Sequence, residues 1–172
     1  LIEARAIDAA INQEDLDALE TSVRELTNNN FQNVHIRFKG IEFMANNLIV
    51  VNDSIVGLKV GDTIEVNYSH YNDGLYVVEE IAGKQIKVQG TPFFVANTGG
   101  SMLTLVQYPA DVTRGIKKLI AYDKKMASKV GIKSESISRM SITYYDVNAS
   151  ENIDGYPASL LSFLTKYEKM RW

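Results

Sequence analysis

The sequence contains no cysteine, so the first candidates for catalysis or metal binding are its two histidines and two close pairs of carboxylates. His35 and His70 each lie in a strand-like stretch. A metal site built on both would need a third ligand, and no spacing suggests one. Without cysteine, disulfides, thiolate zinc sites and thiol catalysis are excluded. The sequence therefore predicts structural roles for both histidines and no metal site.

The carboxylate pairs are not spaced for catalysis either. Glu79 and Glu80 are neighbours in a predicted strand, so their side chains should point to opposite faces. Asp15 and Asp17 lie where a helix begins, and acidic residues are favourable there. Gly99-Gly100-Ser101 lacks the lysine and the following helix of a phosphate-binding loop, and no other catalytic motif occurs. We predict that the chain is not an enzyme, with no catalytic residue and no cofactor.

The composition is that of an ordinary globular protein. The 172 residues are 45% hydrophobic and 23% charged, which is enough for one domain or two small ones with a packed core. No window approaches the roughly 18 apolar residues of a membrane span. Residues 1–11 do not resemble a signal peptide, because Glu3, Arg5 and Asp8 interrupt their apolar pattern. We expect no association with a membrane.

The net charge of −3 hides an asymmetry along the chain. Residues 1–110 hold 7 basic and 14 acidic residues, a balance of −7, whereas residues 111–172 hold 11 basic and 7 acidic residues, a balance of +4. This difference is either an ordinary fluctuation of surface charge or the mark of a bipolar molecule. In the second case, the basic end would meet an acidic partner or the acidic end of a neighbouring copy.

Residues 1–26 have the apolar rhythm of helices. Apolar side chains recur at steps of three and four residues: Ile2, Ala6, Ala9, Ala10, Leu16, Leu19, Val23 and Leu26. The polar run at residues 12–15 predicts a kink or two helices, with Asn12 or Asp15 capping the second. The asparagines at 28–30 favour a turn and should end the pattern.

Residues 31–106 change to a period of two, which predicts short strands. Apolar and polar residues alternate at 34–38, 64–68 and 86–88, and turn-forming residues separate these runs. Tight turns between strands favour an antiparallel β-barrel or sandwich. Closing the sheet would remove the exposed edges of so small a segment.

The helical period returns after Pro109. Asp111 is a predicted N-cap, Gly131 a predicted stop, and the intervening helix has one apolar face: Val112, Ile116, Leu119, Ile120, Ala127 and Val130. Five lysines occupy its remaining surface: Lys117, Lys118, Lys124, Lys125 and Lys129. A strand or hairpin arm at 140–144 should follow. The triplet Gly155-Tyr156-Pro157 then opens a short helix whose shared face is Leu160, Leu161, Leu164 and Tyr167.

This order of elements predicts an α+β protein. Residues 1–30 and 109–172 would form a small helical core, because neither piece is large enough alone. Residues 31–108 would be an antiparallel β-barrel or sandwich inserted into that core.

Nucleic-acid binding is the alternative function that the residues allow. Tyr68, Tyr71 and Tyr76 cluster near a turn, and small barrels bind single strands with such aromatics. However, residues 31–108 contain five basic and seven acidic residues, which is a poor field for phosphates. The lysine-rich helix after Pro109 is better supplied, although such a run is commonly a solvated helix face.

Two stretches of the C-terminal third resemble one family. Residues 134–146 combine a Ser-Glu-Ser-Ile turn with a tyrosine-rich strand, and residues 155–172 combine a Gly-Tyr-Pro helix start with a basic, aromatic end at Arg171-Trp172. From Pro109 onward the chain resembles the head–tail connectors, or adaptors, of tailed bacteriophages with siphophage morphology. Residues 56–66, 72–81 and 86–88 separately resemble a small β-barrel module of phage structural proteins. The usual compact connector lacks such an insert.

The resemblance implies a structural protein of the virion neck, assembled in the bacterial cytoplasm. Copies would form a ring, commonly a dodecamer, that docks on the portal protein and extends the DNA channel towards the tail. A tail-side connector, stopper or tail-completion protein would bind below it, and DNA would pass without specific recognition. The channel wall should avoid strong cationic patches, so most of the lysines of residues 111–130 should face away from it. A tail-completion protein is a related alternative.

The C-terminal arm is the predicted portal-binding site. Its residues combine cationic and large apolar side chains, the types enriched at interfaces: Lys166, Tyr167, Lys169, Met170, Arg171 and Trp172. We expect residues 169–172 to leave the body of the subunit and insert into the portal. The alternative for Tyr167 is that its ring packs into its own subunit.

Overall fold

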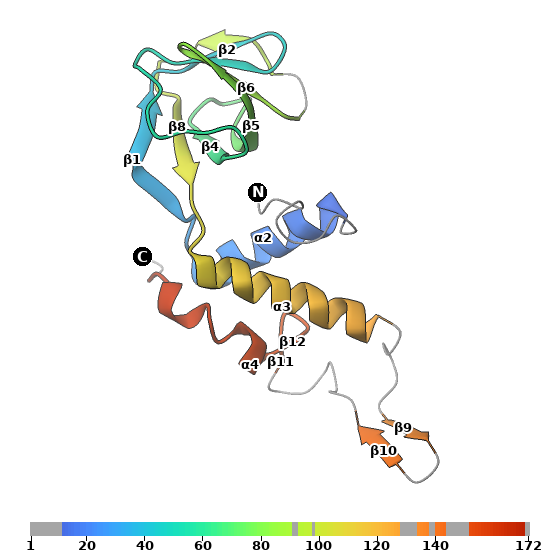
Figure 1. Cartoon of the computed structure of the whole chain (residues 1–172). Coiled ribbons are helices and arrows are strands. Elements are labelled where there is room, and N and C mark those ends of the chain that lie inside the picture. The colour runs from blue at the N-terminus through green and yellow to red at the C-terminus, as the bar shows by residue number, and fades with distance from the viewer. Residues whose placement is uncertain are drawn as a thin grey trace. The chain divides into compact units, whose positions relative to one another are not determined.

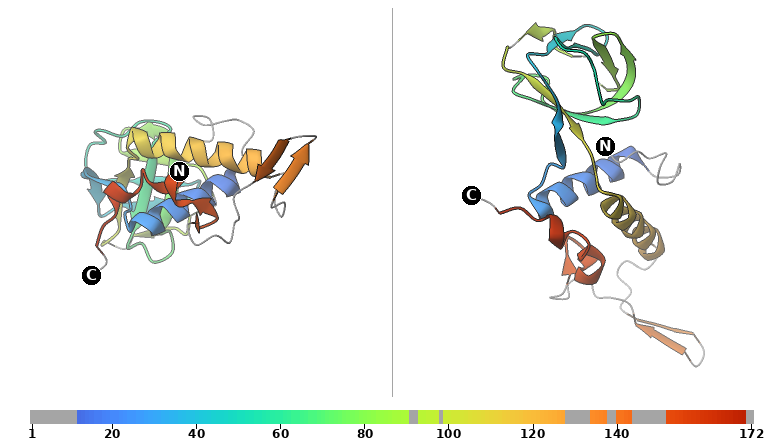
Figure 2. Two further views of the ribbon diagram at one scale, coloured as in Figure 1. Left: turned by 90° about the horizontal axis from the view of Figure 1, so that it is seen from below. Right: turned by 60° about the vertical axis from the view of Figure 1, so that its left-hand side comes forward.

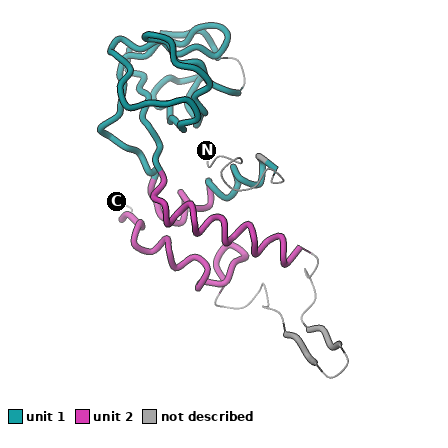
Figure 3. The backbone as a smooth tube through the Cα atoms, viewed as in Figure 1, with its two compact units in different colours: residues 1–20, 30–107 teal, residues 21–29, 108–172 magenta. Residues whose placement is uncertain are grey.

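The computed structural model describes residues 12–90, 93–97, 99–127, 134–137, 140–143 and 152–170 (Figure 1). The chain divides into two compact units (Figure 3). Unit 1 comprises residues 1–20 and 30–107, and unit 2 comprises residues 21–29 and 108–172. The division places residues 1–20 with the strands, whereas the predicted division placed residues 1–30 with the C-terminal helices. The predicted insertion of residues 31–108 into a helical domain stays a prediction.

Helix α2 (Gln13–Thr27) begins at the predicted polar run. The side chain of Asn12 accepts a hydrogen bond from the main-chain N–H of Glu14 at 3.3 Å, so Asn12 and not Asp15 caps the helix. Leu16, Leu19 and Val23 are buried, as their spacing predicts, whereas Leu26, the fourth member of the predicted face, is exposed. The predicted helix within residues 1–11 lies outside the described residues.

The strands of unit 1 form one antiparallel sheet in the order β1-β8-β4-β5-β6-β3-β2-β7. Their bounds are β1 (Gln32–Lys39), β2 (Glu42–Met44), β3 (Leu48–Val50), β4 (Thr63–Asn67), β5 (Gly74–Ala82), β6 (Gln85–Val88), β7 (Ala96–Asn97) and β8 (Met102–Val106). The α+β class is confirmed. The predicted closed barrel is wrong: within the described residues β1 and β7 end the sheet and do not pair. The two residues of β7 pair with β2.

The open sheet nevertheless curls round a single core (Figure 2, right). Seven of its strands contribute apolar side chains to one buried cluster, among them Phe38, Phe43, Ile49, Ile64, Val78, Ile86 and Leu103. Strand β4 departs from the predicted alternation of buried and exposed positions, because Thr63 and Glu65 are buried as well as Ile64 and Val66. Both faces of the sheet are therefore covered at this strand.

Unit 2 is centred on helix α3 (Ala110–Met126). The predicted face of Val112, Ile116, Leu119 and Ile120 is buried, together with Gly115, while Ala127 is exposed. Pro109 precedes the first turn, and Asp111 makes no capping bond, so the predicted cap at Asp111 is wrong. Its carboxylate is engaged by the C-terminal segment instead. The predicted continuation to residue 130 and stop at Gly131 lie outside the described residues.

The rest of unit 2 consists of short elements: β9 (Ser134–Ile137), β10 (Met140–Thr143), β11 (Asn152–Ile153), β12 (Tyr156–Pro157), helix α4 (Ala158–Leu161) and the 3₁₀ turn η1 (Thr165–Tyr167). The predicted strand at 140–144 is confirmed for residues 140–143, which pair with β9. The triplet Gly155-Tyr156-Pro157 was expected to open the final helix with Pro157 at its first position; the helix begins one residue later, at Ala158, because Tyr156 and Pro157 form the second strand of a hairpin. The predicted helical face of Leu160, Leu161, Leu164 and Tyr167 is wrong as one helix, because α4 ends at Leu161 and Tyr167 lies in the 3₁₀ turn. Leu161 and Leu164 are buried, whereas Leu160 and Tyr167 are half-buried.

Candidate functional site

The carboxylate of Asp111 holds the start of the predicted portal-binding arm. The hydroxyl of Tyr167 donates to its Oδ1 at 2.6 Å, and the Lys166 ammonium forms an ion pair with its Oδ2. Hydrogen bonds from Lys166 and Tyr167 lower the pKa of Asp111 to about 2. The same carboxylate raises the pKa of Lys166 and that of Tyr167. Asp111 also lies in the first turn of α3, where the helix dipole favours a negative charge.

Hydrogen bonds to the main chain of the C-terminal segment continue this attachment from Tyr167 to Met170. The N–H of Lys169 donates to the carbonyl of Thr27 at 2.8 Å. The side-chain amide of Asn28 donates to the carbonyl of Met170 at 3.2 Å, and that of Asn29 donates to the carbonyl of Tyr167 at 3.2 Å. The end of α2 and the C-terminal segment are therefore joined within unit 2 as far as Met170.

These contacts differ from those expected of the predicted arm. The side chains of Lys166 and Tyr167 bind Asp111 of the same subunit, and the main chain does not leave the body of the subunit at Lys169, contrary to expectation. The side chains of Lys169 and Met170 are exposed, that of Met170 by 77%. Arg171 and Trp172 lie outside the described residues. Portal binding by these six residues stays a prediction.

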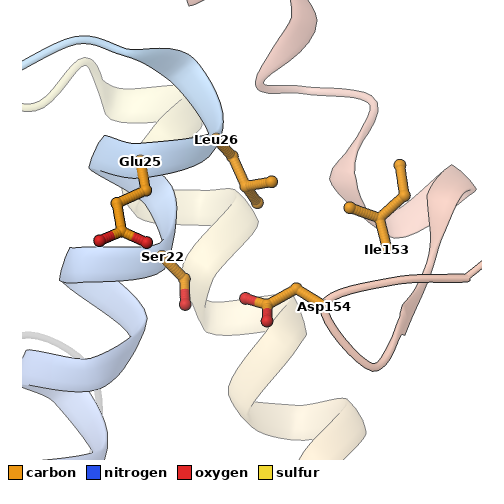
Figure 4. Close-up of a pocket in the computed structure, with 5 residues that line it drawn as sticks. All are labelled: Ser22, Glu25, Leu26, Ile153 and Asp154. Atoms are coloured by element: carbon orange, nitrogen blue, oxygen red, sulfur yellow. The ribbon is translucent and has the colours of Figure 1, made fainter.

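Unit 2 also contains an open pocket of about 370 Å³ that the sequence did not predict (Figure 4). Its walls come from the second half of α2 and from the turn between β11 and β12: Ser22, Glu25, Leu26, Ile153 and Asp154. Figure 4 shows Leu26 and Ile153 on opposite sides of the pocket, with the Asp154 carboxylate directed towards Ser22. The pocket thus combines two apolar walls with polar oxygens.

The hairpin that forms one wall of the pocket depends on the dipeptide Asp154-Gly155. Both residues have left-handed backbones, with φ of 52° and 81°, as a two-residue hairpin turn between β11 and β12 requires. The hydroxyl of Tyr156 donates to Asp123 Oδ2 at 2.6 Å, which attaches the hairpin to α3. An Asp-Gly pair flanked by Ile153 and Tyr156 is a known hairpin signal, and it could have identified this turn from the sequence.

Unit 1 presents a second candidate surface, here called the aromatic turn, at residues 68–73 with Phe94 and Val95. Tyr68, Tyr71, Phe94 and Val95 are all exposed, Tyr71 by 72%. The rings of Tyr71 and Phe94 lie 5.8 Å apart between centroids. Tyr68 was predicted to continue a strand, but it follows the end of β4 with a left-handed backbone. Tyr76, the third predicted aromatic, is partly buried against Phe93.

Buried polar groups fix the shape of the aromatic turn. Asn72 is 3% exposed, and its amide both donates to the carbonyl of Phe94 at 2.8 Å and accepts from its N–H at 3.0 Å. The N–H and hydroxyl of Ser69 donate to Asp73 Oδ1 at 2.7 and 2.6 Å. Desolvation opposes ionisation of Asp73, but the hydrogen bonds from Ser69 outweigh it and lower the pKa of this carboxylate. Left-handed backbones at Tyr68 and His70 cost energy, which this network offsets.

The other residues considered for chemistry are dispersed. His35 lies on β1 and His70 in the aromatic turn, and both are exposed. Within the described residues, no three metal-ligating side chains lie together. Glu79 pairs with Lys87 at 3.2 Å. Ser101 is buried and donates to the carbonyl of Ile41 at 2.7 Å, a structural role. The absence of catalysis stays a prediction.

Comparisons with known proteins add no assignment. The sequence matches no protein-family model, and a search of curated proteins finds no match. Among the described helices, none has the length and apolarity needed to cross a membrane.

Proposed function

We propose that this protein is a structural head–tail connector of a tailed phage. Copies form a ring that docks on the portal protein and extends the DNA channel towards the tail-side partner. In this proposal the helices form the connector core, and the β-strands of residues 31–108 are an insert within it. The localisation would be the neck of the virion, and no cofactor is required.

The fixed presentation of the C-terminal segment is the observation that carries the proposal. Asp111, Thr27 and Asn28 anchor residues 166–170, so the exposed side chains of Lys169 and Met170 are displayed at a defined place. A preordered segment loses less conformational entropy on docking than a free one. Methionine and basic residues next to the aromatic Trp172 also have the chemistry of an interface anchor. Together with the resemblance from Pro109 onward, this supports portal binding.

Deletion of residues 169–172 tests the proposal. The deletion removes one main-chain hydrogen bond to Thr27 and the Asn28 contacts, but no buried side chain among the described residues. We expect the variant to keep its far-ultraviolet circular dichroism and to lose co-sedimentation with the portal protein of the same phage. Portal binding retained by the folded deletion variant would contradict the proposed site.

A matched pair of substitutions separates the side chains from the main chain. Met170→Ala removes an apolar side chain that is 77% exposed, and Val56→Ala removes one that is 73% exposed in unit 1. We expect Met170→Ala to weaken portal binding and Val56→Ala to leave it unchanged. Equal effects of the two substitutions would mean that Met170 is not at the interface.

Single-stranded nucleic-acid binding is the second candidate, and the exposed rings of Tyr71 and Phe94 favour it. The charge of the surrounding segment opposes it, since residues 31–108 hold five basic and seven acidic residues. Steeply salt-dependent binding to single-stranded DNA by the whole protein would favour this candidate over the connector.

A further inference from the structure

We propose that Asp154-Gly155, at the tip of the hairpin of β11 and β12, is a site of spontaneous succinimide formation. There the aspartate becomes isoaspartate, and an extra methylene group enters the main chain. The reaction needs only water and is independent of the proposed connector function.

The sequence contains two Asp-Gly pairs, Asp73-Gly74 and Asp154-Gly155, and no Asn-Gly pair. Glycine after aspartate favours ring closure, because no side chain shields its nitrogen and its main chain turns freely. The two pairs share this chemistry but lie in different surroundings. Each pair is therefore a control for the other.

The first requirement is a carboxyl group that is free to approach the next nitrogen. Asp154 is exposed and lines the open pocket (Figure 4), and among the described residues no hydrogen bond or ion pair holds its carboxylate. Asp73 is held, because the N–H and the hydroxyl of Ser69 donate to its Oδ1 at 2.7 and 2.6 Å. These hydrogen bonds also favour the ionised carboxylate, which is a poorer electrophile than the protonated carboxyl group.

The second requirement is a main chain that can bend to close the ring. The ladder of β11 and β12 contains two residue pairs, and Gly155 in the turn belongs to neither. So short a two-stranded ladder is marginally stable by itself and opens locally at low cost. Gly74 instead lies in β5 and pairs with Val66 of β4, so bending its main chain would break a ladder of the large sheet. Both requirements select Asp154.

The atoms balance without an oxidant or a reductant. The Gly155 nitrogen attacks Cγ of Asp154 and forms a C–N bond. The hydroxyl group of the protonated carboxyl leaves with the N–H proton as water, which gives a five-membered succinimide. A second water molecule opens the ring. Cleavage between the nitrogen and Cγ restores aspartate, whereas cleavage between the nitrogen and the main-chain carbonyl carbon gives isoaspartate with a free α-carboxylate.

Isoaspartate should disrupt the hairpin, because the turn fixes its register. A two-residue turn sets the pairing of β11 with β12, and the added methylene group lengthens that turn. The hydroxyl of Tyr156, next to the turn, would lose its position against Asp123 Oδ2. The wall of the pocket that Ile153 and Asp154 form would move as well.

Incubation in water labelled with heavy oxygen tests the site. The whole protein is kept for several weeks at physiological temperature and neutral pH and is then digested with trypsin in ordinary water. Each ring opening leaves one labelled oxygen at the residue. Peptides 60–84 and 140–166 contain one Asp-Gly pair each, so fragmentation in the mass spectrometer locates the label. An isoaspartate-specific methyltransferase measures the isoaspartate formed.

We expect labelling at Asp154 to be at least about tenfold faster than at Asp73, the factor that corresponds to one charge-assisted hydrogen bond of Asp73. In guanidinium chloride the two pairs should label at similar rates, because neither the Ser69 bonds nor the ladders remain. Asp154→Glu is the matched control. It keeps the charge but would need a six-membered ring, so labelling at residue 154 should stop.

Absence of label at Asp154, or labelling at Asp73 that is as fast in the folded protein, would overturn the inference. A preference for Asp154 that persists in guanidinium chloride would overturn it too, since the fold would then not select the site. None of these results bears on ring formation or portal binding, so failure of this inference leaves the connector proposal standing.

Discussion

The effect of Gly115→Ala on the free energy of unfolding tests how closely α3 packs against the C-terminal segment. It is buried, and a Cβ built there would overlap the ring of Phe163, which follows α4. The helix therefore approaches the C-terminal segment so closely that no side chain fits between them. Phe163 lies two residues before the turn that carries Lys166, so this packing helps to set the path of the candidate site.

Two opposing terms determine the effect of Gly115→Ala. Alanine in a helix interior is favoured over glycine by about 1 kcal/mol. Forcing a methyl group into occupied space costs about 1–3 kcal/mol. The net expectation is a loss of about 0–2 kcal/mol in the free energy of unfolding. In a Phe163→Ala background the overlap is absent, so the same substitution should instead stabilise the protein by about 1 kcal/mol.

A double-mutant cycle measured by urea denaturation and far-ultraviolet circular dichroism tests this reasoning. The coupling energy between positions 115 and 163 should be about 1–3 kcal/mol, and the effect of Gly115→Ala should change from unfavourable or neutral to favourable. Stabilisation by the same amount in both backgrounds would refute it, because the ring of Phe163 would then not occupy the space beside Gly115.

Two further substitutions test the polar contacts. The pKa of Asp111 is about 2 in the folded protein and 3.8 ordinarily, so its contribution to stability is complete above pH 3.8 and is lost as the pH falls towards 2. In thermal melts at a series of pH values, Asp111→Asn should lose that part of the acid dependence. An unchanged profile would count against the contact between Asp111 and Lys166. Asn72→Ala should destabilise unit 1 by about 1–3 kcal/mol in urea melts, because it leaves a main-chain N–H and a carbonyl of the aromatic turn without their partner, whereas a neutral effect would mean that the turn is held otherwise.

Periodicity predicted the elements whose burial follows one simple pattern. The faces of α2 and α3 came from apolar residues at helical spacing, and the antiparallel strands came from alternation between turn-forming residues. Strand β4 shows where such patterns stop being informative. In the sequence polar Thr63 and Glu65 alternate with apolar Ile64 and Val66, but tertiary packing covers both faces, and Glu65 accepts a hydrogen bond from Gln32 at 2.8 Å.

The candidate sites were harder to predict because they depend on contacts far apart in the chain. An aspartate at the start of a helix, such as Asp111, is normally predicted to be its N-cap. Nothing in the neighbouring sequence indicates that the hydroxyl of Tyr167 donates a hydrogen bond to this carboxylate instead. The pocket needs Leu26 beside Ile153, which are joined only by the fold. The tyrosines near residues 68–76 predicted an aromatic cluster. Their exposure could not be predicted, because the alternating pattern did not indicate the left-handed backbone at Tyr68.

The lysines of α3 distinguish a channel component from a DNA-binding protein. Lys117, Lys118, Lys124 and Lys125 are exposed on the helix whose opposite face is buried. A ring that lets DNA pass should not hold it, so we predict that these lysines face away from the lumen. Each lysine that binds a phosphate contributes about 0.9 to the slope of log affinity against log salt concentration.

Replacing these four lysines with glutamine tests the prediction. If they bound DNA, the replacement would reduce the slope by about 3–4 and abolish binding at moderate salt, and the chain would be a nucleic-acid-binding protein. The connector proposal requires the opposite result, in which fluorescence anisotropy finds only weak affinity of wild type for duplex DNA and the variant assembles and binds the portal as before. The charge on α3 then serves solubility, because assembly that survives the loss of these four charges does not depend on their contact with an acidic neighbour.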